Sequence, residues 1–123
     1  LSLTESPFPA ETAARFGMRV LHLPIVDMCA PSIPQAHACC VQIDQSIIAG
    51  QTIAVHCKAG LGRTGTILAA YWLWTRQGQV SATQAIAHIR SLNAKMIQSD
   101  AQTQFIADFA KYLAQYLATT LVS

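Results

Sequence analysis

The sequence predicts an α/β fold in which a mainly parallel central sheet is flanked by helices on both faces. Strand-like apolar runs alternate with helical patterns along the chain. Residues 51–57 (QTIAVHC) form a short run with an apolar centre at 53–55, which we interpret as a parallel strand covered on both sides. A tight glycine loop and a helical pattern follow this run directly, as they do in strand–loop–helix units.

The first third of the chain predicts two strands, a short helix and a loop. Residues 1–3 (LSL) and 18–23 (MRVLHL) are the expected strands. Residues 9–17 predict a short helix, because a proline lies in its first turn and a glycine lies at its end. Three prolines mark residues 24–34 as a loop.

Three later helices are predicted from S-x-x-Q capping boxes, in which the side chains and backbone N–H groups of two residues bond reciprocally. The boxes predict helices from residue 32 to about 49, over 82–93 and from residue 99 onward, and a fourth helical pattern covers 63–78. The capping pairs are Ser32 with Gln35, Ser81 with Gln84, and Ser99 with Gln102. The last helix carries an apolar stripe typical of a core face: Phe105, Phe109, Tyr112, Leu113, Tyr116 and Leu117.

Composition limits the class of protein. The 123 residues suit one domain spanning 1–123, and 52% apolar with 11% charged residues indicates a packed core. A net charge of +2 is too small to indicate nucleic-acid binding. Neither a bilayer-spanning run nor a secretory leader pattern is seen, so we expect a cytoplasmic monomer without membrane insertion. Because the chain opens at Leu1 inside an apolar run, we expect earlier elements of the domain to be missing.

The four cysteines lack the paired spacing of a zinc site, so no metal or cofactor is predicted. Cys39 and Cys40 are expected to be small core side chains in a reducing compartment. Cys29 lies near Asp27 in the sequence and is a candidate disulfide partner for an oxidised Cys57.

Two motifs overlap at residues 55–65 (VHCKAGLGRTG). The three glycines spell G-x-G-x-x-G, a dinucleotide-binding pattern that requires an acidic residue about 20 positions later. After Asp44 the next acidic residue is Asp100, so the expected window is empty. Cys57 and Arg63 spell C-x5-R, which indicates a phosphate site instead; a nicotinamide-dependent oxidoreductase remains the weaker hypothesis.

The phosphate interpretation accounts for each residue of the loop. Backbone N–H groups are expected to converge on an anion at the beginning of a helix, with the Arg63 fork on two of its oxygens. The glycines allow the loop to curl, and Gly65 is expected to let the helix pack tightly against the strand. The predicted phosphate-binding positions are Lys58, Ala59, Gly60, Leu61, Gly62 and Arg63.

Cys57 is predicted to be the nucleophile of this loop. A helix N-terminus and a nearby arginine lower the pKa of a cysteine thiol from ~8.5 to roughly 3.5–7.5, which makes a thiolate at neutral pH. Thr64 can donate its hydroxyl to the sulfur and so improve it as a leaving group. His56 is expected to orient the loop rather than to act as a base.

A leaving alkoxide or phenoxide also needs a proton donor. Between Thr12 and Ser99 the candidates are Asp27, in the proline-rich loop, and Asp44, which we expect on a solvated helix face. Loops that follow parallel strands gather at one sheet edge, so Asp27 is predicted as the general acid. An ionised thiol beside a protonated carboxyl predicts a bell-shaped pH–rate profile.

At this point the residues resemble a known family. Residues 56–66 (HCKAGLGRTGT) are similar to the H-C-x5-R-[S/T] signature of cysteine-based protein phosphatases, especially the small atypical dual-specificity type. Residues 21–32 (LHLPIVDMCAPS) resemble the acid loop of that family, and residues 85–106 resemble its later segments more thinly. The resemblance implies a phosphatase-like fold and adds Gln102 as a residue that could place the hydrolytic water, besides its capping role.

Together these observations predict a phosphomonoester hydrolase, with a dual-specificity protein phosphatase as the first hypothesis. Its partners would be phosphorylated proteins or small phosphomonoesters, without nucleic acid. A phosphoinositide phosphatase is the alternative, since Lys58 adds positive charge beside the pocket. A pseudo-phosphatase that binds phosphorylated ligands without turnover is the other.

Overall fold

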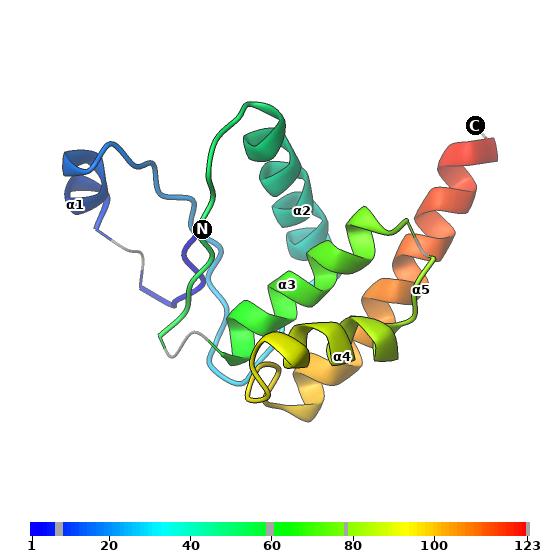
Figure 1. The fold of residues 1–123 in the computed structure, drawn as a ribbon. Coiled ribbons are helices and arrows are strands. Elements are labelled where there is room, and N and C mark those ends of the chain that lie inside the picture. Colours follow the sequence, from blue (N-terminus) through cyan, green and yellow to red (C-terminus); the bar gives the residue numbers. More distant parts are fainter. Residues whose placement is uncertain (7–8, 59–60, 78, 123) are drawn as a thin grey trace.

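A computed structural model describes residues 1–6, 9–58, 61–77 and 79–122. These parts of the chain contain the helices α1 (Ala10–Arg15), α2 (Ile33–Ile48), α3 (Gly62–Thr75), α4 (Ala82–Leu92) and α5 (Asp100–Val122). Extended segments run between α1 and the other four helices, so that α1 lies apart from them (Figure 1). The predicted order of helices is therefore confirmed.

The capping boxes place the helix beginnings where the sequence predicts them. The Ser32 side chain accepts from the Gln35 N–H, and the Gln35 side chain accepts from the Ser32 N–H, with the same exchange between Ser81 and Gln84. The end of α3 differs from the prediction, because the helix stops at Thr75. Gln77 takes a left-handed φ of 52°, which ends the helix before Gly78, a residue outside the described part of the chain.

The predicted parallel sheet is not confirmed, because the described residues contain no strand. Isolated parallel bridges join Ser2 to His22 on one side and to His56 on the other. The pairing extends over few backbone bonds, such as Leu3 N–H to the His56 carbonyl at 2.9 Å and Leu23 N–H to the Ser2 carbonyl at 2.9 Å. The three segments therefore lie side by side in parallel.

Helix α3 is central to the helical part, where it packs against α2, α4 and α5. Its side chains Ala69, Ala70 and Leu73 are buried in a cluster with the apolar stripe of α5. The predicted stripe is confirmed at its first positions, whereas Tyr116 is exposed. A second cluster joins α3 to the extended segments: Leu3, Ile25, Cys39, Ile43, Cys57 and Ile67.

Asp44 does not lie on a solvated face, and that prediction is wrong. Its two carboxylate oxygens accept hydrogen bonds from the Tyr71 hydroxyl and the Trp74 indole N–H, each at 2.6 Å. The carboxylate therefore joins α2 to α3. Sequence spacing did not reveal this role, because both donors lie about thirty residues away on another helix.

We expect Asp44→Ala to lower the free energy of unfolding by about 2 kcal/mol, because two half-buried donors lose a charged acceptor. Urea unfolding followed by tryptophan fluorescence measures this change. Gln45→Ala, at an exposed position of the same helix, is the matched control and should leave the free energy nearly unchanged. Equal midpoints for the two variants would contradict the role given to Asp44.

Stability should also fall at alkaline pH. Burial, together with the hydrogen bond to Asp44, raises the pKa of Tyr71 from 10.0 to about 12. A raised folded-state pKa stabilises the fold below the unfolded value and loses that contribution as the pH rises through the folded value. The unfolding free energy of the wild type should therefore decline more steeply between these two pH values than that of Tyr71→Phe. Parallel pH curves for the two proteins would refute this expectation.

Candidate active site

Cys57 and Thr64 meet where the extended segment turns into α3. The thiol is 8% exposed, and the Thr64 hydroxyl donates to its sulfur at 3.2 Å. A hydroxyl donor stabilises a sulfur anion more than a neutral thiol. The contact predicted between these two residues is therefore present.

The beginning of α3 offers backbone N–H groups to an anion. The cap residue Leu61 makes no side-chain hydrogen bond to the first turn of the helix. The first N–H groups of a helix have no partner within it, and together with the helix dipole they favour negative charge. Gly62 and Arg63, the first two residues of α3, therefore lie at a position suited to phosphate.

Arg63 is a buried cation whose hydrogen bonds are incomplete. Its side chain is 5% exposed, one guanidinium nitrogen (Nη1) donates to the Ile25 carbonyl at 2.8 Å, and Nη2 lies 3.8 Å from an Asp27 oxygen. Its buried Nε has no partner among the described residues. A buried charge is costly unless it is paired and hydrogen-bonded, so the guanidinium suits an additional oxyanion.

Asp27 is brought to the same place from the loop that precedes α2. Its carboxylate lies at ion-pair distance from Arg63 and accepts from the Met28 N–H at 2.9 Å. The side chain is 70% exposed, so the carboxylate can exchange protons with water. The structure therefore pairs Cys57 with Thr64 and Arg63 with Asp27, and Thr64 and Arg63 are neighbours in the first turn of α3.

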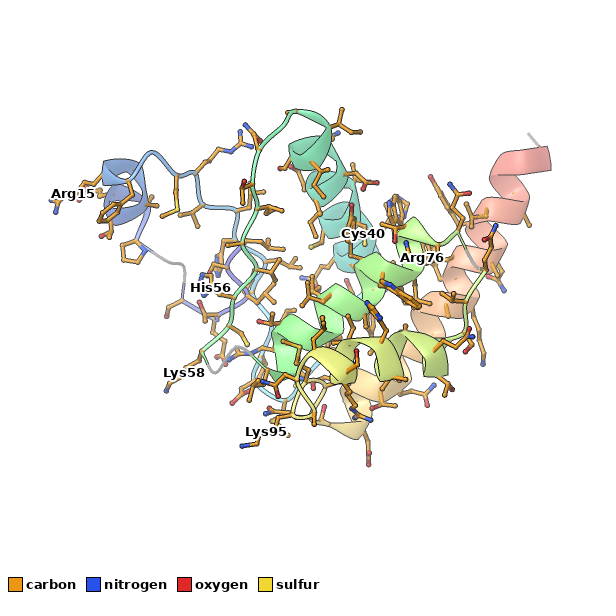
Figure 2. All side chains as sticks on the ribbon, viewed as in Figure 1. Arg15, Cys40, His56, Lys58, Arg76 and Lys95 are labelled. Carbon is orange, nitrogen blue, oxygen red and sulfur yellow. The ribbon has the colours of Figure 1, made fainter. Side chains whose placement is uncertain are left out.

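Other predicted residues lie around this group or outside the described chain. Ala59 and Gly60 are not among the described residues. Lys58 is exposed and its side chain points outward at the beginning of the loop (Figure 2). The Leu61 carbonyl accepts from the N–H groups of Gly65 and Ile97, so this residue joins the loop to the segment before α5.

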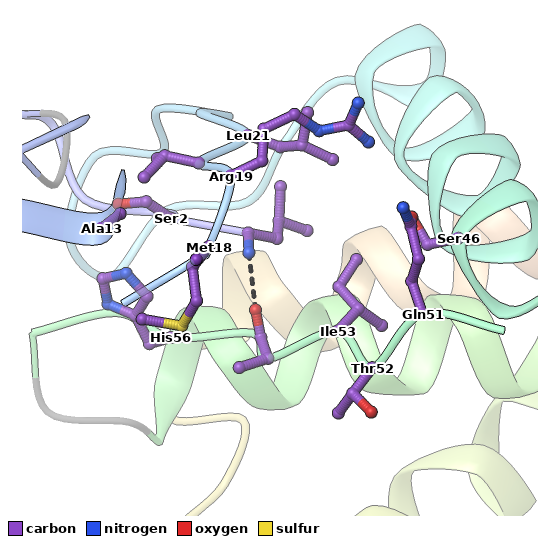
Figure 3. A pocket seen from close by; sticks show the side chains of 14 residues that line it. Ser2, Ala13, Met18, Arg19, Leu21, Ser46, Gln51, Thr52, Ile53 and His56 are labelled. Carbon is purple, nitrogen blue, oxygen red and sulfur yellow. Dashed lines mark hydrogen bonds between the residues drawn. The ribbon is translucent and has the colours of Figure 1, made fainter. Parts of the chain in front are cut away.

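His56 lines a cavity of about 630 Å³ beside the extended segments, close to Ser2 and Met18 (Figure 3). Its backbone pairs with Leu1 and Leu3 on the neighbouring segment. This pairing fixes the residue that precedes Cys57. The orienting role predicted for His56 stays a prediction.

Gln102 is fully buried, and the predicted capping pair with Ser99 is present. The Gln102 N–H donates to the Ser99 hydroxyl at 3.1 Å, and the Gln102 side-chain oxygen accepts from the Ser99 N–H at 3.2 Å. Sequence reasoning missed that Ser99 also reaches the acid loop, where its hydroxyl donates to the Met28 carbonyl at 2.6 Å. The S-x-x-Q pattern identifies the cap but carries no information about a partner so distant in the chain.

The remaining cysteines are distributed as follows. Cys39 and Cys40 are buried as predicted, and burial raises the pKa of the Cys39 thiol to about 11. Cys29 is exposed on the acid loop.

Among the described residues no group of three or more His, Cys, Asp or Glu side chains could hold a metal ion. In the same residues every helix falls short of the length and apolar character that a membrane span needs.

Comparison with known proteins agrees with this geometry. Residues 2–79 match the family described as "Tc-R-P: Polymorphic toxin system, DSP-PTPase phosphatase". The chain belongs to this family. The match includes Asp27, Cys57, Arg63 and Thr64, so the family assignment covers both of these pairs.

Individual relatives place the chain in the wider superfamily of cysteine-based phosphatases. The zebrafish (Danio rerio) "Protein tyrosine phosphatase domain-containing protein 1" is 43% identical over 50% of this chain and 8% of its own length. The Arabidopsis thaliana "Phosphatidylglycerophosphate phosphatase PTPMT2" is 27% identical over 97% of this chain and 52% of its own length. The crystal structure of Tk-PTP in the active form has a TM-score of 0.79 and 27% identity over 93% of this chain and 76% of that one.

These likenesses confirm the superfamily that the signature predicts. They also show that the overall fold is similar to that of solved phosphatase structures. The chain spans about half the length, or less, of the curated relatives given above. Its fold is similar to that of Tk-PTP, although its own described residues form helices and isolated bridges only.

Gly65 packs closely against residues outside the loop, so a substitution there tests how far the loop depends on its surroundings. A Cβ at this position would lie 2.8 Å from the Met96 Cβ and 3.0 Å from the Ile97 backbone nitrogen, so the close approach is to the segment before α5 rather than to the strand that the sequence predicted. Gly65→Ala should displace the first turn of α3, cost about 1–3 kcal/mol of stability and lower kcat/KM at least about tenfold.

Gly50→Ala provides the matched control for that substitution. Gly50 has a φ of 74° and no atom within 4 Å of an added Cβ. The control should lose about 1 kcal/mol from backbone strain while its kcat/KM on an aryl phosphate stays at the wild-type value. Equal activities for the two variants would show that the contact with Met96 and Ile97 does not matter to the site.

Proposed function

We propose that this chain hydrolyses phosphomonoesters through a phospho-cysteine intermediate, as a dual-specificity protein phosphatase. One observation carries the proposal. Three groups lie at the beginning of α3. The buried Cys57 sulfur accepts a hydrogen bond from Thr64, the buried Arg63 has an Nε without a partner among the described residues, and the exposed Asp27 carboxyl lies beside Arg63. A nucleophile, an oxyanion donor and a proton donor are the groups that phosphate-ester cleavage requires.

In the first step the Cys57 thiolate attacks phosphorus, so that an S–P bond forms as the P–O ester bond breaks. Arg63 and the N–H groups at the beginning of α3 hold the equatorial oxygens, which stabilises the charge that builds up on them. Asp27 gives its proton to the departing oxygen. The product leaves as a neutral alcohol or phenol.

In the second step water attacks the phospho-cysteine, and the S–P bond breaks. The Asp27 carboxylate takes the proton of the water, and inorganic phosphate is released. The Thr64 hydroxyl already lies against the sulfur, so it stabilises the thiolate as it leaves. The enzyme returns to its starting state with a protonated Asp27 and an ionised Cys57.

A lipid substrate is the second candidate. Lys58 is exposed next to Cys57, and a cation at that position favours substrates that carry additional negative charge. The Arabidopsis thaliana relative, which aligns with nearly the whole chain, is named a phosphatidylglycerophosphate phosphatase.

The third candidate, binding without turnover, is disfavoured because each group of the reaction is present. We further propose a cytoplasmic, reducing setting, which suits the exposed Cys29 thiol and the nucleophile.

Hydrolysis of p-nitrophenyl phosphate tests the activity. The wild type should turn over this ester in the presence of a chelator, with a bell-shaped pH–rate profile. Cys57→Ser should abolish turnover, and Asp27→Asn should lower kcat/KM about 100-fold and flatten the alkaline limb of the profile. Asp108→Asn, an exposed carboxylate on α5, is the control and should behave like the wild type.

The outcomes separate the candidates. Phosphate binding without turnover in the wild type would make the protein a pseudo-phosphatase, and full turnover in Cys57→Ser would remove the proposed nucleophile. Phosphate release from phosphotyrosine and phosphothreonine peptides, compared with phosphatidylglycerophosphate and a phosphoinositide in vesicles, distinguishes the substrate classes. Higher kcat/KM on the peptides is the expected result, and higher kcat/KM on a lipid would favour the second candidate.

A further inference from the structure

Two side chains at the beginning of α5, those of Ser99 and Gln102, bind the loop that carries Asp27. The Ser99 hydroxyl donates to the Met28 carbonyl at 2.6 Å, and the Gln102 amide (Nε2) donates to the Cys29 carbonyl at 3.2 Å. These carbonyls belong to the two residues that follow Asp27. The backbone on the C-terminal side of the acid is therefore held at two consecutive positions.

The Gln102 side chain is committed to backbone groups. Its oxygen accepts from the N–H groups of Gln98 at 2.8 Å and Ser99 at 3.2 Å, while its NH2 group reaches Cys29. A side-chain amide oxygen has two lone pairs, and both are used here. Gln102 is also 0% exposed, so its side-chain oxygen is buried and fully used by these two backbone groups, while its NH2 group donates to the acid loop.

The backbone of Met28 indicates that the anchor is needed. Its φ of 65° lies in the left-handed region, which non-glycine residues rarely adopt and which persists only where the surroundings impose it. The Ser99 hydroxyl binds the carbonyl of this residue. Without that bond the loop would be free to relax to an ordinary conformation and carry Asp27 with it.

The other side of Asp27 is anchored by the phosphate-binding arginine. Arg63 donates to the Ile25 carbonyl at 2.8 Å, two residues before the acid. The Asp27 side chain itself is 70% exposed and lies 3.8 Å from Arg63. Its carboxylate accepts from the N–H of the adjacent Met28 at 2.9 Å, and its own N–H donates to Glu5 at 3.4 Å. Its position therefore depends on the backbone of the residues on both sides.

We propose that Ser99 and Gln102 are positioning residues for the proton-transfer step, and that they hold the acid loop so that Asp27 faces the leaving oxygen. This inference rests on the proposed phosphatase function. It assigns Gln102 to cleavage of the ester, whereas the resemblance to known phosphatases suggested a role in hydrolysis of the intermediate. Both residues lie beyond the segment 2–79 that matches the family.

The chain contains its own control for this idea. Ser81 and Gln84 form the same reciprocal cap at the beginning of α4, and no bond from that cap to the acid loop is found in the described residues. Ser81→Ala removes a helix cap alone. Ser99→Ala removes a helix cap together with the bond to the Met28 carbonyl.

The experiment compares two esters with different needs for a proton. Phenyl phosphate has a poor leaving group that requires protonation, and 2,4-dinitrophenyl phosphate has one that departs as an anion. Ser99→Ala and Gln102→Ala should lower kcat/KM about tenfold on phenyl phosphate and less than about threefold on the dinitrophenyl ester. Ser81→Ala should change neither, and adding Ser99→Ala to Asp27→Asn should cause no further loss on phenyl phosphate.

Each contrary result has a distinct meaning. Equal behaviour of Ser99→Ala and Ser81→Ala would overturn the proposal. A burst of phenol release in Gln102→Ala, with kcat lowered equally on both esters and kcat/KM unchanged, would return Gln102 to the water step. If thermal melting shows that Gln102→Ala does not fold, Ser99→Ala decides alone. Absence of turnover in the wild type would instead remove the proposed function, and this inference with it.

Discussion

The buried guanidinium of Arg63 is the constraint on which the site depends. A cation that is 5% exposed needs acceptors around it. The described residues supply the Ile25 carbonyl and, at 3.8 Å, the Asp27 carboxylate, and they leave the buried Nε without a partner. These partners come from the loop before α2, whereas Arg63 belongs to α3. The contacts of Arg63 with Ile25 and Asp27 therefore hold the acid loop against the beginning of α3, the helix that follows Cys57.

The position of that charge is fixed by the helices behind it. Helix α3 packs against α2, α4 and α5, so its first turn cannot move without disturbing the core. In front of it, Gly65 approaches Ile97 so closely that a methyl group would not fit. Arg90 of α4 donates to the carbonyls of Met96 and Ile97 at 3.2 and 2.8 Å, which holds this segment in place. The packing of the helices thus holds the N-terminal end of α3 in a fixed position.

Sequence reasoning succeeded where the determining interaction is local. The capping boxes join residues three apart, and the spacing from Cys57 to Thr64 spans one loop, so both follow from short-range geometry. It failed for Asp44, which is bound by donors on another helix, and it overlooked the bond between Ser99 and Met28, 71 residues apart. The predicted sheet depended on pairing between distant segments, and only isolated bridges are formed among the described residues.

The loose contact between Asp27 and Arg63 suits a group that must gain and lose a proton in each cycle. A buried carboxylate in close contact with the guanidinium would remain charged, and it would neutralise Arg63 before any phosphate arrived. At 3.8 Å and 70% exposure the carboxyl stays open to water, while its backbone is held through Ile25, Met28 and Cys29. Anchoring the acid mainly through the backbone of its neighbours allows the exposed carboxyl to be held in place without being buried against Arg63.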